Sequence, residues 1–450
     1  MALFRKLPRE LWPLSLIALA SVVSCAKIET GSIALTTGGE GDALTRSPAL
    51  TTLAVDLIDT AGKAQSLARV SLPAETVSLP DQSIDAAGIV RILGTDAAGT
   101  IQVRGESLPI QIGALGGATL KIFMQRVGEL ARMPGSFLDA RESPVVVPLT
   151  NRYVLVAGGT DPALAKSSQL YDLLTWSPLA TPPTLPRAPV SAVTRDTRAL
   201  LIDDQGASLF DLSDSTSNDI PALAGGSFAE VSGGATVYAP DGSAYVVGGT
   251  RASGTPTARV LRVDVEGALS FVSLAFPRLG ASAAWIEGRG LFVGGGSTTA
   301  PGGEILAPGG SMSAALAFAP DASTGAGAAA LDGTRVLLAG GLTATGGDAG
   351  ARVIDISCAS ACAPAAWTAP FTPPLARVQA FALRVNGTLT DSALVVGDDA
   401  TGKTHVLRAT PLTITEIAMK QARNHARALV LPTGSVAIAG GATVIEAFAP

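Results

Sequence analysis

Tyr153-Val-Leu-Val-Ala-Gly-Gly159 is the stretch of this chain that decides its fold. Its aliphatic run has no polar face, and a strand of that kind must be buried on both sides. The glycine pair then lets the backbone turn where side chains would collide. Residues 169–172, which read Gln-Leu-Tyr-Asp, predict the next strand, and Trp176 follows them. The stretch therefore predicts two neighbouring strands inside a stack of sheets.

The same pattern recurs to the end of the chain, with an Asp-Asp pair in place of the glycines twice. The pairs begin at Gly158, Asp203, Gly248, Gly295, Gly340, Asp398 and Gly440, so they are 45, 45, 47, 45, 58 and 42 residues apart. Self-similarity at a nearly fixed period of this size is typical of repeat proteins. Residues 141–450 thus divide into seven units of about 44 residues, enough for four antiparallel strands each.

One unit also carries aromatic residues at informative positions. Tyr171 and Trp176 follow the first glycine pair. An arginine lies 16 to 21 residues ahead of five of the pairs, at Arg141, Arg187, Arg278, Arg377 and Arg423. This pattern resembles the kelch repeat, in which a diglycine is followed by spaced tyrosine and tryptophan. The resemblance covers residues 141–450 and implies an all-β fold with a seven-bladed kelch-like β-propeller. Only Tyr171 and Trp176 match the aromatic pair cleanly, so the repeats are degenerate.

The repeated arginines and the aspartate pairs have both a structural and a functional interpretation. The arginines could form an anion pocket at the ring centre, but their repetition favours hydrogen bonds to loop carbonyls of the neighbouring blade. Asp203-Asp204 and Asp398-Asp399 suggest calcium, yet two carboxylates are too few for a site that needs six to eight oxygens. Because both pairs replace a diglycine, we expect them to serve turn geometry.

Closure of the ring needs one more strand than the last unit contains. That unit stops at Pro450 after three recognisable strands. An open sheet edge would invite aggregation. We therefore expect either that a segment just before Arg141 supplies the outer strand, or that the last blade is three-stranded.

The residues before the repeats predict a second, smaller β domain. Short alternating runs bounded by Gly, Pro, Asp or Ser recur over residues 51–130 and predict a β-sandwich-like domain. Residues 25–50 are expected to form an anchor or linker with a first strand at 31–36. Residues 131–140 are expected to be a linker to the repeats.

The N-terminus has the organisation of an export signal. Arg5, Lys6 and Arg9 form a basic region, a short apolar stretch follows over 12–23, and Val22-Val-Ser-Cys25 ends it. This end resembles the lipobox of bacterial lipoproteins, which implies that 1–24 is a lipoprotein signal peptide and that Cys25 carries the lipid. Two or more acyl chains would hold the chain on a membrane stably. An ordinary secretory signal is the alternative. Because Ala26 is not aspartate, we expect the bacterial cell envelope, and within it the outer membrane.

The two remaining cysteines, Cys358 and Cys362, lie close together. An exported protein meets an oxidising compartment, which favours a local disulfide. Two cysteines without nearby histidines cannot complete a tetrahedral zinc site. We therefore predict a disulfide that staples an insertion, and no metal site.

Few residues in the sequence can carry catalysis. His405 and His425 are the only histidines, and neither lies in a nucleophile-elbow motif. We interpret both as surface histidines or histidines of the first strand of a unit. Copper-radical oxidases built on a similar propeller need a tyrosine cross-linked to cysteine, and no free cysteine lies near a tyrosine here. The formal charge of −5 gives no footprint for nucleic acid. We predict no catalytic residues and no cofactor.

The most direct functional hypothesis is a non-catalytic binding scaffold. Loops over a rigid ring form a broad face suited to a protein or glycan ligand. The alternative is a propeller-based enzyme or carbohydrate receptor with its site at the channel mouth. Convergence of acidic residues, Arg and His within about 4 Å at one end of the channel, together with perturbed titration of these groups, would favour that alternative.

Overall fold

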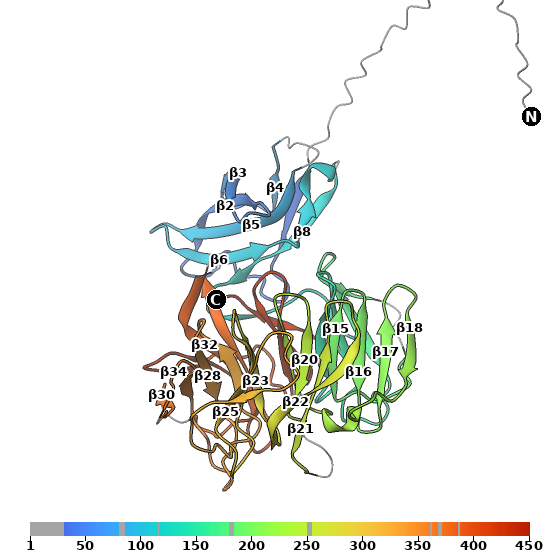
Figure 1. The fold of residues 1–450 in the computed structure, drawn as a ribbon. Coiled ribbons are helices and arrows are strands. Elements are labelled where there is room, and N and C mark those ends of the chain that lie inside the picture. The colour runs from blue at the N-terminus through green and yellow to red at the C-terminus, as the bar shows by residue number, and fades with distance from the viewer. Residues whose placement is uncertain are drawn as a thin grey trace, which may run out of the picture.

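The structure is a computed structural model that describes residues 31–80, 86–115, 117–179, 184–249, 254–360, 362–367, 371–385 and 388–450. These residues form nine β-sheets and two short 3-10 turns, η1 (Ile112–Ala114) and η2 (Phe228–Glu230). The predicted all-β class is confirmed. No helix in this part of the chain is long and apolar enough to cross a membrane. Figure 1 shows two bodies, a smaller one with the N-terminal strands and a larger one below it. The predicted signal peptide and Cys25 lie outside the described residues.

Seven of the sheets are four-stranded and antiparallel, and six of these consist of consecutive strands. The first sheet contains β11 (Val145–Leu149), β12 (Tyr153–Ala157), β13 (Ser168–Asp172) and β14 (Ser177–Pro178). The second contains β15 (Ser191–Arg195), β16 (Arg198–Ile202), β17 (Ala207–Asp211) and β18 (Thr216–Ile220). The third contains β19 (Ala235–Tyr238), β20 (Ala244–Val247), β21 (Thr257–Val263) and β22 (Leu269–Arg278). The fourth contains β23 (Ser282–Ile286), β24 (Gly290–Gly294), β25 (Gly303–Leu306) and β26 (Ala314–Ala315).

The next two sheets repeat this order, and the seventh breaks it. The fifth contains β27 (Gly327–Ala330), β28 (Arg335–Ala339), β29 (Arg352–Asp355) and β30 (Ala365–Ala366). The sixth contains β31 (Ala376–Val385), β32 (Thr388–Asp398), β33 (Thr404–Ala409) and β34 (Ile414–Glu416). The seventh contains β35 (Arg427–Val430), β36 (Val436–Ala439), β37 (Glu446–Phe448) and β10 (Leu130–Arg132). The second strand of each sheet is almost wholly buried, as its apolar sequence predicts.

The seven sheets form a closed, propeller-like ring. The first strand of each sheet contacts the first strand of the next, and β35 contacts β11. Side chains also bridge neighbouring first strands. Thr236 Oγ1 donates to the carbonyl of Ala192 at 2.7 Å. The Gln379 amide both donates to and accepts from the backbone of Ala428, at 2.9 and 2.7 Å. The ring is therefore held by polar contacts along its channel as well as by the apolar second strands.

The strand that completes the last sheet comes from the N-terminal side of the repeats. β10 pairs with β37 in antiparallel register, with Leu130 opposite Phe448. The first of the two predicted modes of closure is confirmed, and the three-stranded last sheet is wrong. The structure also differs from the predicted linker at 131–140, because Ala131 and Arg132 belong to this strand. The sequence pattern missed the strand since it is only three residues long.

The smaller body consists of the remaining two sheets. One has the order β4-β1-β8, formed by β4 (Thr76–Ser78), β1 (Ser32–Thr36) and β8 (Thr119–Phe123). The other has the order β3-β2-β5-β6-β9, formed by β3 (Ala64–Ser71), β2 (Leu50–Ile58), β5 (Ala87–Asp96), β6 (Ile101–Glu106) and β9 (Gln125–Arg126), with β7 (Ile110–Gln111) beside β5. Ile33, Leu53, Ile92 and Ile122 lie in one core shared by both sheets, and each is fully buried. The first strand expected at 31–36 is found as β1, and it packs into the core of this body.

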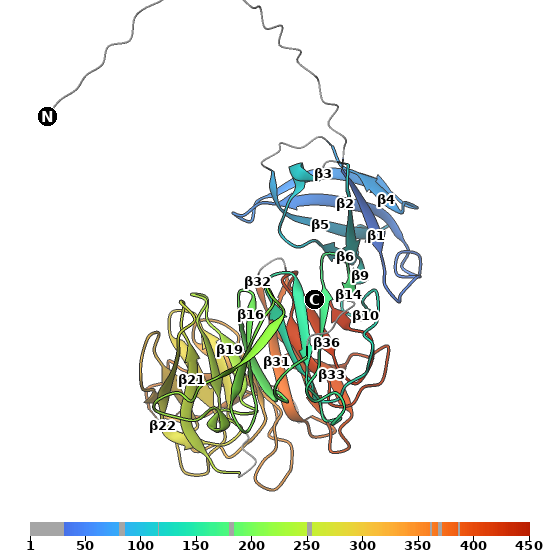
Figure 2. The same cartoon turned by 90° about the vertical axis from the view of Figure 1, so that its right-hand side faces the viewer.

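The two bodies are joined by more than the chain connection (Figure 2). Trp176 packs against Phe123 of β8 with ring centroids 5.5 Å apart, and its indole Nε1 donates to the Lys121 carbonyl at 3.1 Å. Gln125 Nε2 donates to Ser435 Oγ in the β35–β36 turn at 2.8 Å. The N-terminal sheets therefore rest on the first and seventh sheets of the ring.

This contact defines two different faces of the ring. In an antiparallel sheet, successive turns lie at opposite ends. The β35–β36 turn contacts the N-terminal sheets, so the turns that follow the second strands lie at the other end. We call this end the diglycine face. It consists of the turns that begin at the seven Gly or Asp pairs and the loops that enter the first strands.

Candidate functional site

The glycine pairs are required by close packing between neighbouring sheets. Gly158 has a φ of 68°, and a Cβ at this position would lie 2.7 Å from the Pro189 carbonyl oxygen. Gly440 has a φ of 92°, and a Cβ there would lie 2.7 Å from Pro144 Cγ. L-residues rarely adopt such φ values, and the space is already filled. These glycines are therefore structural.

The aspartate pairs close the same turns by hydrogen bonding. Asp203 Oδ1 accepts from the amides of Gln205 and Gly206, both at 2.8 Å. Asp399 Oδ1 accepts from the amide of Thr401 at 2.8 Å in the same way. Aspartate commonly replaces glycine in turns because its carboxylate can bind the backbone two residues ahead. The predicted role in turn geometry is confirmed.

Three of the repeated arginines bind the first glycine of their own repeat. Arg141, Arg278 and Arg423 each donate from Nη1 to the carbonyl 17 positions ahead, at 3.2, 2.7 and 3.0 Å. The predicted hydrogen bonding to loop carbonyls is confirmed. The carbonyl lies in the neighbouring sheet for Arg278, the last residue of β22, but in the same sheet for Arg141 and Arg423. Arg141 and Arg423 lie in the loops that enter β11 and β35, and each of these loops meets the turn after the second strand at the same end of one hairpin.

Two of these arginines also form fully buried ion pairs. Arg278 Nε lies 2.7 Å from Glu304 Oε1, and Arg423 Nη2 lies 3.0 Å from Glu446 Oε1, with no exposed surface on any of the four side chains. A buried charge is tolerated only when it is paired and hydrogen-bonded. These arginines are consequently unavailable to a ligand.

The two arginines that precede aspartate pairs behave differently. Arg187 Nη1 lies 3.4 Å from Asp203 Oδ1, and Arg377 Nη2 lies 3.2 Å from Asp398 Oδ2. A carboxylate here replaces the carbonyl partner of the other units. The Arg377 side chain keeps 46% of its surface exposed. Arg377 therefore remains accessible on the diglycine face.

Asp398 is the centre of a group of charged side chains on this face. Its carboxylate is almost fully buried, and Oδ1 accepts from Thr404 Oγ1 at 2.8 Å. Oδ2 lies 3.2 Å from Arg377, 3.3 Å from His425 Nδ1 and 3.3 Å from Arg427 Nη1. Arg377 Nη2 also contacts His425 Nδ1. One carboxylate thus holds two guanidinium groups and an imidazole. We call Arg377, Asp398, Thr404, His425 and Arg427 the Asp398 cluster.

The electrostatics of this cluster favour a fixed arrangement. Burial lowers the pKa of the Arg427 guanidinium, Asp398 raises it in part, and Arg377 lowers it further. Arg377 and His425 both have left-handed backbones, with φ of 49° and 50°. Such conformations cost of order 1–3 kcal/mol each and persist only where the surroundings impose them. Arg377 is therefore held in place by its neighbours rather than free to move.

The second histidine lies behind this cluster. His405, in β33, is buried between Asp399 Oδ2 at 3.1 Å and Glu416 Oε1 at 2.9 Å. The Thr401 hydroxyl, followed by the bond to His405, holds the pKa of the Asp399 carboxyl well below its usual range although burial raises it. The predicted surface or first-strand position is wrong for His405, because it is buried in β33, the third strand of its sheet. His425 instead lies in the loop before β35, within the Asp398 cluster.

The spatial part of the convergence named for the alternative function is present. Asp398, Arg377 and His425 lie within 3.3 Å of one another at one end of the ring. The sequence pointed to Arg377 as a repeat arginine and to His425 as a histidine, but not to their contact. Arg427 and Thr404 carried no sequence signal. The cluster can present a fixed guanidinium to an acceptor group on a ligand.

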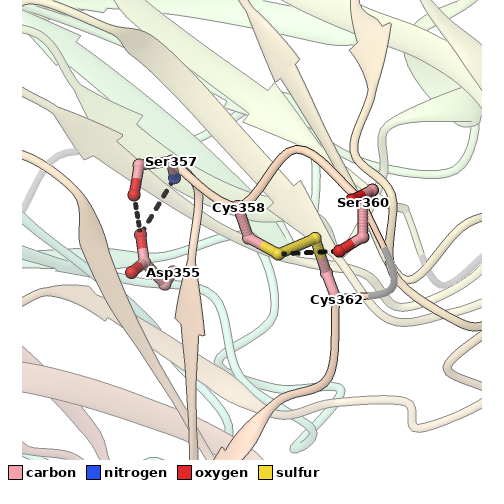
Figure 3. The surroundings of a disulfide bond; sticks show 5 residues. All are labelled: Asp355, Ser357, Cys358, Ser360 and Cys362. Carbon is pink, nitrogen blue, oxygen red and sulfur yellow. Dashed lines mark hydrogen bonds between the residues drawn. A yellow bond between two sulfur atoms is a disulfide. The ribbon is translucent and has the colours of Figure 1, made fainter.

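The remaining predicted residues lie away from this cluster. Cys358 and Cys362 form a disulfide in the fifth sheet's outer loop, with Cα atoms 5.9 Å apart (Figure 3). The Cys362 backbone pairs with Phe318 of the preceding unit. In the part of the chain that the structure describes, no group of three or more His, Cys, Asp or Glu could hold a metal ion.

Comparison with known proteins yields no family assignment. No protein-family model matches the chain, and no curated protein matches its sequence. The kelch resemblance consequently rests on the sequence pattern alone.

Solved structures resemble the chain only distantly. A chain of the "Crystal Structure of Mitotic Checkpoint Complex" has 11% identity and a TM-score of 0.47, covering 72% of this chain and 92% of that chain. The computationally designed Ika8 protein has 10% identity and a TM-score of 0.44, covering 71% and 100%. The tricorn protease has 11% identity and a TM-score of 0.40, covering 85% and 41%. The evidence for the ring is therefore the strand order of its seven sheets and the contacts between their first strands.

Proposed function

We propose that this chain is a lipid-anchored scaffold of the bacterial cell envelope that binds a partner on the diglycine face. Its ring would be a seven-bladed propeller of the kelch type, preceded by a β-sandwich. Cys25 would carry the lipid, and the outer membrane is the favoured location. The partner would be a protein or a glycan, bound without catalysis.

One observation carries this proposal: the faces of the ring are unequally occupied. The N-terminal sheets rest on one face through Trp176 and Gln125. The opposite face presents Arg377, which is half exposed and fixed by a buried carboxylate. A preorganised arginine loses little entropy on binding, and arginine is enriched among residues that dominate binding energy. This supports the diglycine face as the docking surface.

The proposal is tested by capture of partners from native envelope membranes. Wild-type protein, R377A and R335A would each be used for affinity capture followed by mass spectrometry. Arg335 is a matched control, because it has 45% exposure and its own aspartate partner, Asp332, near the opposite end of the sheet. We expect R377A to capture at least tenfold less of a specific partner than the wild type does, and R335A to capture as much of it as the wild type does. Equal capture by all three proteins would contradict the proposal.

The alternative, an enzyme or carbohydrate receptor at the ring mouth, is favoured by the contact of His425 with Asp398. An enzyme would turn over one of a panel of chromogenic ester and glycoside substrates. Its rate would fall at least a hundredfold in H425A, since general acid–base catalysis contributes about that much or more. If the wild type turns over a substrate and H425A does not, the enzyme hypothesis replaces the scaffold hypothesis.

A further inference from the structure

A hollow on the diglycine face lies apart from the Asp398 cluster. Its volume is about 370 Å³. Phe276, Leu279, Thr298, Thr299 and Thr324 are among the residues that line it. They come from the end of β22, from the turn after β24 and from the loop that enters β27. The hollow therefore lies across the third, fourth and fifth sheets.

One wall of the hollow is held in place by an arginine that belongs to a buried ion pair. Arg278, two residues after Phe276, pairs with Glu304 at 2.7 Å without any solvent exposure. Its two terminal nitrogens donate to the carbonyls of Gly295 at 2.7 Å and Pro301 at 2.6 Å. These carbonyls lie at the start and end of the turn that forms one wall. The guanidinium thus fixes both ends of that wall.

The walls are also tied to one another through the backbone. Leu279 N donates to the Gly296 carbonyl at 3.0 Å, and Gly296 N donates to the Ser323 carbonyl at 2.8 Å. Within the turn, Ser297 Oγ accepts from the amide of Ala300 at 3.1 Å. Binding sites for small ligands are usually preformed hollows of about 300–1,000 Å³. This hollow meets both conditions.

The lining selects for an uncharged ligand with polar and apolar faces. The described residues that line the hollow include no charged side chain. Phe276 keeps 37% of its surface exposed, and the side chains of Thr298 and Thr299 are exposed as well. An aromatic ring packs against apolar C–H surface, while hydroxyl groups donate and accept hydrogen bonds. A pyranose ring offers both kinds of surface.

We propose that this hollow binds a neutral saccharide, with a sugar ring on Phe276 and its hydroxyls on Thr298 and Thr299. The inference rests on the proposed function, whose glycan partner it specifies. A proline-rich peptide is less favoured, because peptides of that kind dock on grooves lined by several aromatic residues. Among the described residues that line the hollow, Phe276 is the one aromatic residue.

The test is saturation-transfer NMR on the solubilised mature chain. The probes are cellobiose and N,N′-diacetylchitobiose, with digalacturonic acid as an acidic counterpart and a proline-rich decapeptide as a peptide. We expect at least one neutral disaccharide to bind and its affinity to fall at least fivefold in F276A. T299V, which removes a hydroxyl at nearly constant volume, should weaken binding at least twofold. M312A is the control for an exposed apolar side chain outside the hollow, in the loop between β25 and β26, and should bind as the wild type does.

Three results would overturn the inference: no binding of either neutral disaccharide, unchanged affinity in F276A with retained melting temperature, or binding of the acidic sugar or the peptide alone. Partner capture from membranes separates this failure from that of the scaffold. If partner capture depends on Arg377 but no neutral sugar binds, the saccharide site is rejected and the scaffold proposal stands. Loss of both rejects both.

Discussion

Charged residues inside the ring have two distinct fates, and the difference lies in their partners. Arg278 and Glu304 are wholly buried and are satisfied by each other and by backbone carbonyls. Arg377 shares its carboxylate, Asp398, with Arg427 and His425 and stays half exposed. The first arrangement stabilises the fold, whereas the second leaves a cation on the surface. An arginine near the start of a unit thus supplies a structural residue in one unit and a candidate binding residue in another.

Removing Arg278 should be strongly destabilising. R278A leaves Glu304 buried without its partner, and breaking a buried pair costs about 3–5 kcal/mol. Urea denaturation measures the free energy of unfolding. R198A is the control, because Arg198 pairs with Asp211 but is 62% exposed, and such a pair contributes about 0–1 kcal/mol. Similar losses in the two variants would show that burial does not determine the effect.

The Asp398 cluster shows where residue-level prediction stopped. Arg377 was recognised from its place in the repeat, and His425 from its chemistry. Their contact depends on β31 and β35 being neighbours in the ring, which no local pattern specifies. Arg427 is an ordinary strand arginine in the sequence. Sequence reasoning could identify candidates here but not assemble them.

At the scale of the element, the hairpin of first and second strands is the unit that the sequence describes best. The second strands are apolar on both faces, so their burial could be predicted directly. The turn formed by the glycine pair after each of these strands could be predicted as well, because it packs against the neighbouring sheet and leaves no room for a Cβ. β10 could not be found, because three residues, Leu130–Arg132, carry no periodic signal. Its place follows from the need to close the ring.

The steric role of the glycine pairs gives an element-level prediction. In G440A the new Cβ would lie 2.7 Å from Pro144 while the backbone keeps a φ of 92°. The left-handed backbone alone costs an L-residue about 1–2 kcal/mol, and the clash adds to this. Thermal unfolding should therefore shift down by several degrees. G333A is the control, since a Cβ at Gly333 would meet no atom within 4 Å. An unshifted G440A would mean that the turn is not packed as described.

For the whole molecule, the chief consequence of the fold is that two bodies act as one. The aromatic pair that suggested the kelch pattern lies at their junction. Trp176 packs on Phe123 of the N-terminal sheets, and the Tyr171 hydroxyl donates to the Pro134 carbonyl at 2.6 Å. β10 adds a strand that belongs to the ring but directly follows the last N-terminal strand. A lipid at Cys25 would therefore hold a rigid unit at the membrane rather than a tethered ring.

Loss of Trp176 should uncouple the two bodies. Calorimetry of the wild type should show one cooperative transition, and W176A should show two, because truncation of a buried tryptophan costs about 3–5 kcal/mol and here falls on the junction. W285A is the control. Trp285 stacks on Tyr245 within the ring at 5.7 Å, so its loss should lower stability without splitting the transition. Two transitions in the wild type would show that the bodies unfold independently.

Closure of the ring by β10 is the claim on which the two faces, the Asp398 cluster and the docking surface all depend, and a cross-link tests it most directly. Ala131 and Ala447 are directly opposed in the β10–β37 pair, so cysteines at both positions would lie within the Cα separation that a disulfide requires. We predict that A131C/A447C forms an intramolecular disulfide in native protein, seen as a reducible shift on a denaturing gel and by mass spectrometry. A131C/S217C, which pairs β10 with the outer strand of another sheet, should form none. Absence of the bond in A131C/A447C, or equal bonding in both variants, would contradict the closed ring.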